Sequence, residues 1–586
     1  MYKIGNLFKF LGLAALASGL SVTAQAQRIS DFSLIDHTGK FHQISRYADT
    51  DAVVLFVYDK DSEVVADALR DFNRVVDRFE QENIAFFLIE STGLTDKSVI
   101  AAAADEDGIE LPILVDDTQT VSELLHVTRA AQVIVIDPAA REIVYNGSLN
   151  DRFTEGSSRR RARDHYLQEV LESVVAGSEV TVAGQPSSGE AIVYPVLEQQ
   201  AIADIDYVDD VVPVIERRCV SCHQDGGIAP FAMNSHQMLQ GWSPMIREVL
   251  LTKRMPPAQI DPDYVHLFQD QSYITIEETQ TLLHWIDAGS PNNSGSDPLA
   301  AIEHQAPEWE LSERWGEPDM IVKIPPQEIP ATGVVEYRNI PIPLNNEEEL
   351  WVKGVEFKPG DRQVLHHIIA FTFGSDGVNQ FDILNQGIGM GAYAPGNAPN
   401  TFPDGTGYPL RPNGGLLLQM HYTTSGKETV DASEVAIYLY DEKPAKTVFG
   451  GSAADLNIAI PPHAKRHTMT ASKTFPKNVY LSMLGPHMHY RGFDADFKLI
   501  YPDGSEERIL NVPNYQFNWQ TTYDFKEPMY LPAGTELVFN GTFDNSAMNP
   551  YNPDPTVESN FGEQTWQEMF FGFFQYYEAD NQGNSD

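Results

Sequence analysis

The stretch "AVVLFVYDKDSEVVADALRDFNRVVDRFEQENIAFFLIE" (52–90) decides the fold at the N-terminal end of the chain. Its apolar run at 52–58 predicts a buried strand, and a segment with helical spacing separates this run from a second one at 84–90. Two further apolar runs, "LPILVDD" and "AQVIVID", flank the segment "TQTVSELLHV". Strands that alternate with helices predict an α/β domain.

The order of these elements over residues 27–182 resembles the thioredoxin-like redoxin family. That family works with cysteines placed after the first long strand, but the corresponding segment here, "YDKDSEVV" (58–65), has none. Arg129-Ala130-Ala131 stands where the family usually has a cis-proline. We therefore expect a redox-inactive docking or spacer domain.

The segment before this domain, residues 1–26, is typical of a secretory signal peptide. It has lysines at positions 3 and 9, a short apolar core and Ala24-Gln25-Ala26 as a cleavage site. An uncleaved anchor is the alternative, although the apolar core is short for a membrane span. We expect a soluble mature protein, periplasmic or secreted, with no membrane span after signal cleavage.

The composition narrows the possible partners. The chain has 586 residues, so several domains are expected, and 83 acidic against 40 basic residues give a net charge of −43. Such a charge disfavours nucleic acid and anionic membranes as partners. The simplest interpretation of the charge is solubility. Disulfides do not hold the protein together, because Cys219 and Cys222 are its only cysteines.

These two cysteines lie in "CVSCH" (219–223), within a segment of predicted helices at 201–292. The spacing is that of covalent haem c: each cysteine forms a thioether, and His223 is placed to bind the iron. A CxxC disulfide or half of a zinc site is the alternative. We predict a small all-α cytochrome c domain. Its second axial ligand is predicted to be Met255, in a "RMPP" turn that resembles small bacterial cytochromes c. The rival ligands are Met233, Met238 and Met245.

Beyond about residue 320 the pattern changes to short alternating runs with Gly/Pro turns, which predicts antiparallel β-structure of sandwich or jelly-roll type. Five histidines fall within it. They lie in "VLHHIIAF" (His366 and His367), "LLLQMHYTT" (His421) and "GPHMHYRG" (His487 and His489). In a strand, residues i and i+2 face the same way, so His487 and His489 can bind one ion while Met488 faces away. His366 and His367 would diverge on a regular strand, but a bulge or a strand end would let both face one ion.

This set resembles the copper type II, ascorbate-dependent monooxygenases, the family of the peptide-amidating and dopamine-hydroxylating enzymes. The likeness covers roughly residues 319–578 and includes "AYAPGNAP" (392–399) and "QTWQEMFFGF" (564–573). It implies two all-β domains, at 319–443 and 444–578, and two copper ions. One ion, the electron relay, would be held by His366, His367 and His421, and the other by His487, His489 and Met569. O₂ would be activated at the second ion, and a substrate C–H bond hydroxylated. We expect two separate triads around a shared cleft.

The sequence departs from that family where the substrate binds. The peptide-amidating members place an arginine two residues before the HxH motif, and an Asn and a Tyr two and four residues after the Met. Here those positions hold Gly485, Phe571 and Phe573. A peptide carboxylate would find no arginine there. We therefore expect a small, weakly polar organic substrate.

The fused haem segment is a second departure, and we expect it to pass electrons to the copper held by His366, His367 and His421. The donor to the haem could be a cytochrome, a quinol dehydrogenase or an ascorbate-like reductant. The main alternative to a monooxygenase is a non-catalytic periplasmic protein for copper binding or electron transfer. A zinc hydrolase fits less well, because the chain has no HExxH motif.

Overall fold

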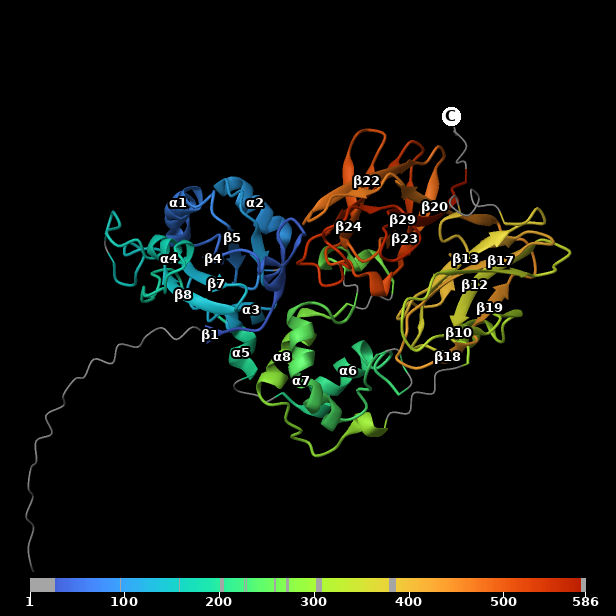
Figure 1. Cartoon of the computed structure of the whole chain (residues 1–586), viewed down its shortest axis with the longest axis horizontal. Coiled ribbons are helices and arrows are strands. Elements are labelled where there is room, and N and C mark those ends of the chain that lie inside the picture. Colours follow the sequence, from blue (N-terminus) through green and yellow to red (C-terminus); the bar gives the residue numbers. More distant parts are fainter. Residues whose placement is uncertain are drawn as a thin grey trace, which may run out of the picture.

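The computed structural model describes residues 27–580, apart from residues 95, 158, 201–204, 226, 228, 258–259, 270–272, 302–307 and 379–385. The predicted signal peptide, residues 1–26, lies outside the described residues. Figure 1 shows three regions along the chain: an N-terminal α/β domain in blue, a helical segment in green, and a large β region in yellow to red. Within the described part of the chain, every helix is too short or too polar to cross a membrane.

The N-terminal domain has one eight-stranded sheet with the strand order β1-β8-β7-β4-β5-β6-β2-β3. Its centre is the predicted strand–helix–strand unit: β4 (Ala52–Tyr58) and β5 (Ile84–Glu90) pair in parallel and are connected by α1 (Glu63–Arg78). The other elements are β1 (Gln27–Arg28), β2 (Ser33–Asp36), β3 (Phe41–Gln43), α2 (Lys97–Asp107), β6 (Ile113–Val115), α3 (Thr120–Leu124), β7 (Gln132–Asp137), β8 (Glu142–Ser148) and α4 (Tyr166–Val175).

Strand β4 is buried along its whole length, and its side chains alternate between two cores. Ala52, Val54 and Phe56 face a core within the domain. Val53 and Leu55 face a second core, which continues into the helical segment and includes Trp285. One face of the sheet is therefore covered by a different region of the chain.

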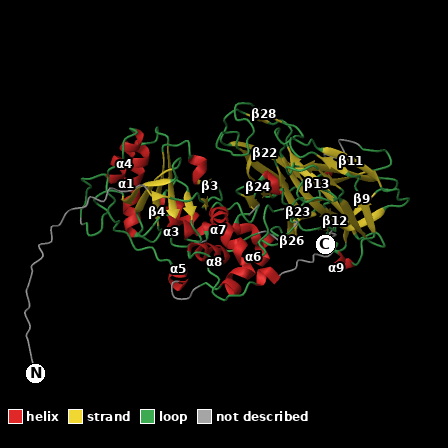
Figure 2. Cartoon of the chain, turned by 60° about the horizontal axis from the view of Figure 1, so that its bottom comes forward, coloured by secondary structure: helices red, strands yellow, loops and turns green. Residues whose placement is uncertain are grey.

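The helical segment contains η2 (Tyr207–Val211), α6 (Val212–Arg218), α7 (His236–Leu251), η3 (Pro262–Leu267) and α8 (Ile276–Asp287), and follows the short α5 (Pro195–Gln200). Figure 2 shows α6, α7 and α8 between the N-terminal sheet and the β region. The first turn of α8 holds the end of α6: Glu278 forms a capping box with Thr275 and accepts hydrogen bonds from Arg217 and Arg218. The residue that follows α6 is Cys219.

The β region has two halves that share one nine-stranded sheet. Strands β9 (Met320–Lys323), β12 (Leu350–Lys358), β15 (Asn400–Thr401), β16 (Thr406–Leu410) and β19 (Glu434–Leu439) come from the first half, and β20 (Lys446–Ala454), β23 (Val479–His487), β26 (Tyr523–Leu531) and β29 (Phe571–Glu578) from the second. Parallel pairing of β16 with β20 joins them. The large β-rich region agrees with the antiparallel β-structure predicted from the sequence. Nothing in the sequence indicated that the two halves share one sheet.

Each half adds a four-stranded sheet of its own. In the first half it is formed by β11 (Arg338–Pro343), β13 (Leu365–Phe373), β14 (Gly391–Tyr393) and β17 (Gly415–Tyr422). In the second half it is formed by β22 (His467–Thr474), β24 (Gly492–Ile500), β25 (Glu506–Val512) and β27 (Glu536–Phe543). The short strands β10 (Gln327–Ile329), β18 (Thr429–Asp431), β21 (Ala459–Ile460) and β28 (Ser559–Asn560) form two further pairs.

An apolar cluster lies at the boundary between the halves. It combines Ile369 of β13 and Leu417 of β17 with Met483 of β23 and Phe571 and Phe573 of β29. The backbones also approach closely there. A Cβ on Gly450 of β20 would overlap the Gln386 carbonyl oxygen and lie 2.7 Å from the Gly389 Cα. Only glycine lets the segment 386–391 of the first half pack on β20 of the second half.

Candidate metal centre

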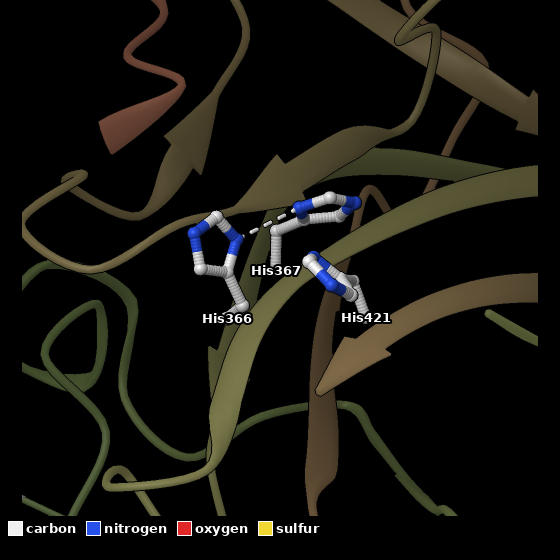
Figure 3. Close-up of side chains that lie close together, drawn as sticks. All are labelled: His366, His367 and His421. Carbon is white, nitrogen blue, oxygen red and sulfur yellow. Dashed lines mark hydrogen bonds between the residues drawn. The ribbon is translucent and has the colours of Figure 1, made fainter. Parts of the chain in front are cut away.

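A β-bulge brings His366 and His367 to the same side of β13. The antiparallel register with β17 places His367 opposite His421 and shifts between Leu365 and His367, so that His366 is the extra residue. One ring nitrogen from each of the three histidines lies within 4.8 Å of the others. Figure 3 shows the three rings facing one another. Of the two arrangements that would let adjacent histidines face one ion, a bulge or a strand end, the bulge is present.

The nitrogen positions suit a metal ion. The Nδ1 atoms of His366 and His367 are 3.2 Å apart, and two ligand nitrogens about 2.0 Å from one tetrahedral ion are about 3.3 Å apart. The Nε2 atoms of His366 and His367 and the Nδ1 atom of His421 are buried and have no hydrogen-bond partner among the described residues. Buried polar atoms without partners are costly. In Figure 3 the Nδ1 atoms of His366 and His367 point toward each other and their Nε2 atoms point away, so an ion shared by these two rings would be bound through Nδ1.

The second histidine pair comes from the end of β23 in the other half. Met488 packs into the core of that half, and the rings of His487 and His489 lie 5.4 Å apart. His487 Nδ1 is hydrogen-bonded to Gln520 Oε1 (3.0 Å), and His489 Nδ1 to the Gln567 carbonyl oxygen (3.2 Å). Partners of this kind orient a histidine ligand and leave its Nε2 available to a metal. The Nε2 of His489 is buried without a partner among the described residues.

Burial keeps these five imidazoles, which we call the histidine cluster, in the neutral form. Desolvation lowers the pKa of His366 to about 4, that of His487 to about 4 and that of His489 to about 3. It lowers the pKa of His421 to about 2, and that of His367 well below its usual value. The neutral form is the one that binds a metal.

The two groups of histidines are in contact. The rings of His367 and His487 lie 6.5 Å apart, and both side chains line one cavity of about 20 Å³. Phe517 stacks on His366 at 4.9 Å and meets His489 edge-on at 5.6 Å. The expectation of two separate triads around a cleft stays a prediction; the shared sheet and the apolar cluster bring one histidine of each group to the same cavity.

Met569 lies at the same boundary. Strand β29 pairs His487 with Phe571, so Met569, two residues before Phe571, is level with His489, two residues after His487. Its half-buried side chain packs in the apolar cluster of the boundary. Met569 thus lies near His489, with which it is predicted to bind copper. Its role as a copper ligand stays a prediction.

Sequence reasoning missed several residues that support the cluster. The buried Glu568 accepts hydrogen bonds from the backbone N–H groups of His489 (2.8 Å) and Arg491 (2.7 Å). Tyr337 stacks on His421 at 4.5 Å. Gln520 and Phe517 come from a loop around η5 (Phe517–Trp519) that has no motif of its own. Of these supporting residues, only Glu568 could have been suspected from the sequence, because it directly precedes the predicted ligand Met569.

The cysteine turn, for which haem c is predicted, follows directly after α6. Cys219 and Cys222 are free and half-buried, and the His223 N–H donates to the Cys219 carbonyl oxygen (2.9 Å). His223 Nδ1 is bonded to the Phe231 carbonyl oxygen (3.0 Å), which leaves Nε2 available to iron. The Met255 amide donates to the Val249 carbonyl oxygen (3.2 Å). The role of Met255 as second axial ligand stays a prediction.

One loop of the β region touches both candidate centres. A Cβ on Gly396 would lie 4.0 Å from Cys222 Sγ. Tyr393 and Ala394, just before it, line the small cavity together with His367 and His487. The cysteine turn and the histidine cluster are thus separated by a single loop.

In the N-terminal domain, the position of the expected redox site is covered by the chain itself. Arg129 forms a β-bridge with Ala191 of the linker. The Ala130 N–H donates to the Glu190 carbonyl oxygen (2.8 Å), and the Ser62 hydroxyl is bonded to the Glu190 carboxylate. At this place the domain thus presents no cysteine, and residues 190 and 191 lie against it.

A family model matches the N-terminal domain. Residues 26–146 match the model of the AhpC/TSA family. The N-terminal region is thus an AhpC/TSA-type, thioredoxin-like domain, and a large β-rich region follows it. No curated protein matches the chain.

Three solved structures illustrate the likeness. A hypothetical protein from Sinorhizobium meliloti is 20% identical, with 28% of this chain and 92% of that chain covered and a TM-score of 0.26. An uncharacterised conserved protein from Geobacillus kaustophilus is 20% identical, with 31% and 98% covered and a TM-score of 0.26. A peroxidoxin from Mycobacterium tuberculosis is 19% identical, with 26% and 93% covered and a TM-score of 0.20.

Proposed function

We propose that the chain is an extracytoplasmic copper-dependent monooxygenase that hydroxylates a C–H bond of a small organic substrate. In the overall reaction, R–H and O₂ combine with two electrons and two protons to give R–OH and water. The observation that carries the proposal is the histidine cluster: five buried, neutral imidazoles, four of which have a ring nitrogen without a partner among the described residues.

The ligand sets follow from the two halves of the β region. His366, His367 and His421 would hold one copper ion, and His487, His489 and Met569 the other. Copper at these positions would supply one-electron chemistry and a place to reduce O₂. Imidazole binds both oxidation states of copper, and a thioether favours the reduced one.

The remaining residues of the site position ligands and exclude water. Gln520 holds His487, and the Gln567 carbonyl oxygen holds His489. The rings of Phe517 and Tyr337 cover the first triad. These contacts keep the imidazoles in one orientation, so little rearrangement is needed when the oxidation state changes.

The walls of the small cavity suit an apolar reacting carbon. Ile369, Ile388 and Phe573 line it beside the two histidines. A Cβ on Gly485, the position of the arginine in the peptide-amidating enzymes, would lie 3.6 Å from both Ile388 and Phe573. A side chain at this position would be in ordinary van der Waals contact with apolar groups, which supports a weakly polar substrate.

Haem c bound at Cys219, Cys222 and His223 is our proposed source of electrons. The contact of Cys222 with the loop at Gly396 supports this proposal, since Tyr393 and Ala394 of the same loop reach His367 and His487. The donor to the haem would be a cytochrome, a quinol dehydrogenase or a small reductant.

One observation favours a second candidate, a non-catalytic copper and haem electron-transfer protein. The cavity beside the histidines has a volume of about 20 Å³, which is space for about one water molecule. An organic substrate would enter only if Phe573, Ile388 or the loop at Gln520 moved. An electron-transfer site needs no such movement.

Metal analysis combined with O₂ uptake tests the proposal. The full-length protein is expected to contain two copper ions and one haem, and to consume O₂ with a reductant and one member of a panel of alkylbenzenes, alkanes and peptidyl-glycines. His487→Ala should abolish uptake, whereas His463→Ala, at an exposed histidine, should not. Two bound coppers without substrate-dependent uptake would favour the electron-transfer protein, and absence of copper would refute both.

A further inference from the structure

A second cavity, of about 260 Å³, lies where all three regions of the chain meet. Its walls include Arg46 of the N-terminal domain, Glu248 and Arg254 of the helical segment, and Tyr490 and Phe517 of the β region. Among the described residues, none lines both this cavity and the small cavity at the histidine cluster. The junction of the three regions thus encloses a separate space, large enough for a small organic molecule.

Arg46 lies at this junction without a carboxylate partner. It belongs to η1 (Ile44–Tyr47), and its guanidinium packs on the ring of Phe493 at 4.2 Å. Arg466 packs on the same ring at 3.7 Å and forms an ion pair with Asp494 (3.0 Å). Arg46, in contrast, forms no ion pair and no side-chain hydrogen bond with any residue that the structure describes. A ring face attracts the charge but accepts none of the N–H groups in the guanidinium plane, so these donors are available to a ligand.

The charges around the cavity favour an anion. Desolvation lowers the pKa of Arg46 from 12.5 to about 10, so the group is still charged at neutral pH. The carboxylate of Asp544 counteracts this shift from a distance, and it accepts the Ser546 N–H (2.9 Å). In the walls themselves, Arg46 and Arg254 face one carboxylate, Glu248, which lies 4.0 Å from Arg254. A half-buried charge without a partner is costly, and a bound carboxylate would form two parallel hydrogen bonds with the guanidinium.

The opposite part of the wall suits a flat apolar group. The rings of Tyr490 and Phe517 meet edge to face, 5.0 Å apart, and Tyr551 lines the same cavity. Aromatic side chains pack favourably against the ring of a ligand. Phe517 also stacks on His366 at 4.9 Å, so a ligand in this cavity would be separated from the histidine cluster by one ring.

We propose that this cavity binds a small aromatic carboxylate, with its carboxylate on the Arg46 guanidinium and its ring against Tyr490, Phe517 and Tyr551. The site needs all three regions, and it gives the thioredoxin-like domain a part in ligand binding that requires no cysteine. It goes beyond the proposed function, because it requires neither copper nor O₂ and is separate from the cavity beside the histidines.

Calorimetric titration of the full-length protein with sodium benzoate tests the proposal. We expect one benzoate per chain, and much weaker binding of benzamide, which has nearly the same shape but no charge. Arg46→Gln should weaken benzoate binding about tenfold or more, as expected when a charged hydrogen-bond partner is lost. Arg70→Gln, the same change at an exposed arginine of the same domain, is the matched control and should bind benzoate as the unaltered protein does.

A second variant tests the aromatic wall. Tyr551 is 46% exposed, so Tyr551→Ala removes a ring from the cavity without opening the core, and it should also weaken benzoate binding. Acetate and inorganic phosphate carry the charge without a ring, and we expect both to bind more weakly than benzoate.

Absence of benzoate binding, equal binding of benzoate and benzamide, or unchanged binding in Arg46→Gln would each overturn the site. Acetate or phosphate that binds as tightly as benzoate would overturn the aromatic class of ligand. The comparison of benzoate with benzamide and acetate uses the unaltered protein, so the proposal is tested even if Arg46→Gln does not fold. These titrations need no copper, and their failure would leave the proposed function standing.

Discussion

At the scale of single residues, the histidine cluster depends on acceptors that are not ligands themselves. Glu568 is fully buried and fixes the turn after β23, because its two oxygens accept the N–H groups of His489 and Arg491. The Arg491 guanidinium is bonded to Asn545 (2.8 Å) and to the Trp566 carbonyl oxygen (2.9 Å). The orientation of His489 is therefore set by a small polar network within the second half.

Glu568→Ala should destabilise the protein and disorder the turn. Each buried N–H group left without an acceptor costs about 1–3 kcal/mol, and two groups lose theirs. We expect a lower midpoint of chemical denaturation and weaker binding of the copper ion that we propose at His487, His489 and Met569. Glu563→Ala, at an exposed position of the same segment, is the control. An unchanged midpoint in Glu568→Ala would contradict this role.

Asp116 predicts a pH dependence of stability. Burial raises its pKa from 3.8 to about 7, so the folded state keeps a proton that the unfolded chain releases near pH 3.8. The unfolded state then binds fewer protons, and the contribution of Asp116 to stability falls as the pH rises from about 4 to 7. Between pH 4 and 7 the midpoint of thermal unfolding should fall less in Asp116→Asn than in the unaltered protein. If the midpoint falls equally steeply with pH in both proteins, the carboxyl group of Asp116 is ionised in the folded state.

At the scale of elements, the first turn of α8 holds in place the cysteine turn that we propose binds haem. Glu278 closes the N-terminus of α8 and accepts hydrogen bonds from Arg217 and Arg218 at the end of α6, directly before Cys219. The position of the cysteine turn thus depends on a cap that lies some 60 residues away in sequence.

Glu278→Ala should loosen this connection. Thr275 stays in place as the N-cap, but its backbone N–H loses the Glu278 carboxylate as acceptor. An N–H group without its acceptor costs about 1–3 kcal/mol, and loss of the partner of Arg217 and Arg218 adds to it. We expect a lower midpoint of thermal unfolding. We also expect a lower yield of covalently bound haem, which is measured by its absorbance. Glu277→Ala removes a neighbouring, exposed carboxylate of the same turn and should change neither.

Much of this arrangement could be predicted at the level of elements. The run at 52–58 forms β4 and the run at 84–90 forms β5, because long apolar runs are buried whatever surrounds them. The bulge at His366 was implied by two adjacent histidines and one ion. The roles of Phe517 and Gln520 could not be foreseen, because their loop becomes significant only when it folds over strands from both halves.

At the scale of the whole molecule, the three regions meet through buried polar contacts. Lys97 of the N-terminal domain forms an ion pair with Asp261 of the helical segment. Asp261 also accepts a hydrogen bond from Asn511 of the β region (2.9 Å). Gln280 of α8 donates to the Thr118 carbonyl oxygen (2.9 Å) in the N-terminal domain. These contacts indicate that the regions form one body.

Lys97→Ala should weaken the junction of all three regions. Removing one partner of a buried ion pair costs about 3–5 kcal/mol, because the remaining charge stays buried. We expect a lower thermal midpoint and faster proteolysis between the regions. Lys60→Ala breaks an exposed pair with Asp61 and is the control. If both variants behave alike, the Lys97 contact does not hold the regions together.

The division of β4 between two cores has a practical consequence for recombinant production. The row of Val53, Leu55 and Val57 belongs to a cluster that the N-terminal domain and the helical segment build together. A chain ending at the linker would lack the helical part of this cluster and would expose apolar surface, which favours aggregation. The thiol-free thioredoxin-like domain and the helical segment should therefore be expressed as a single unit.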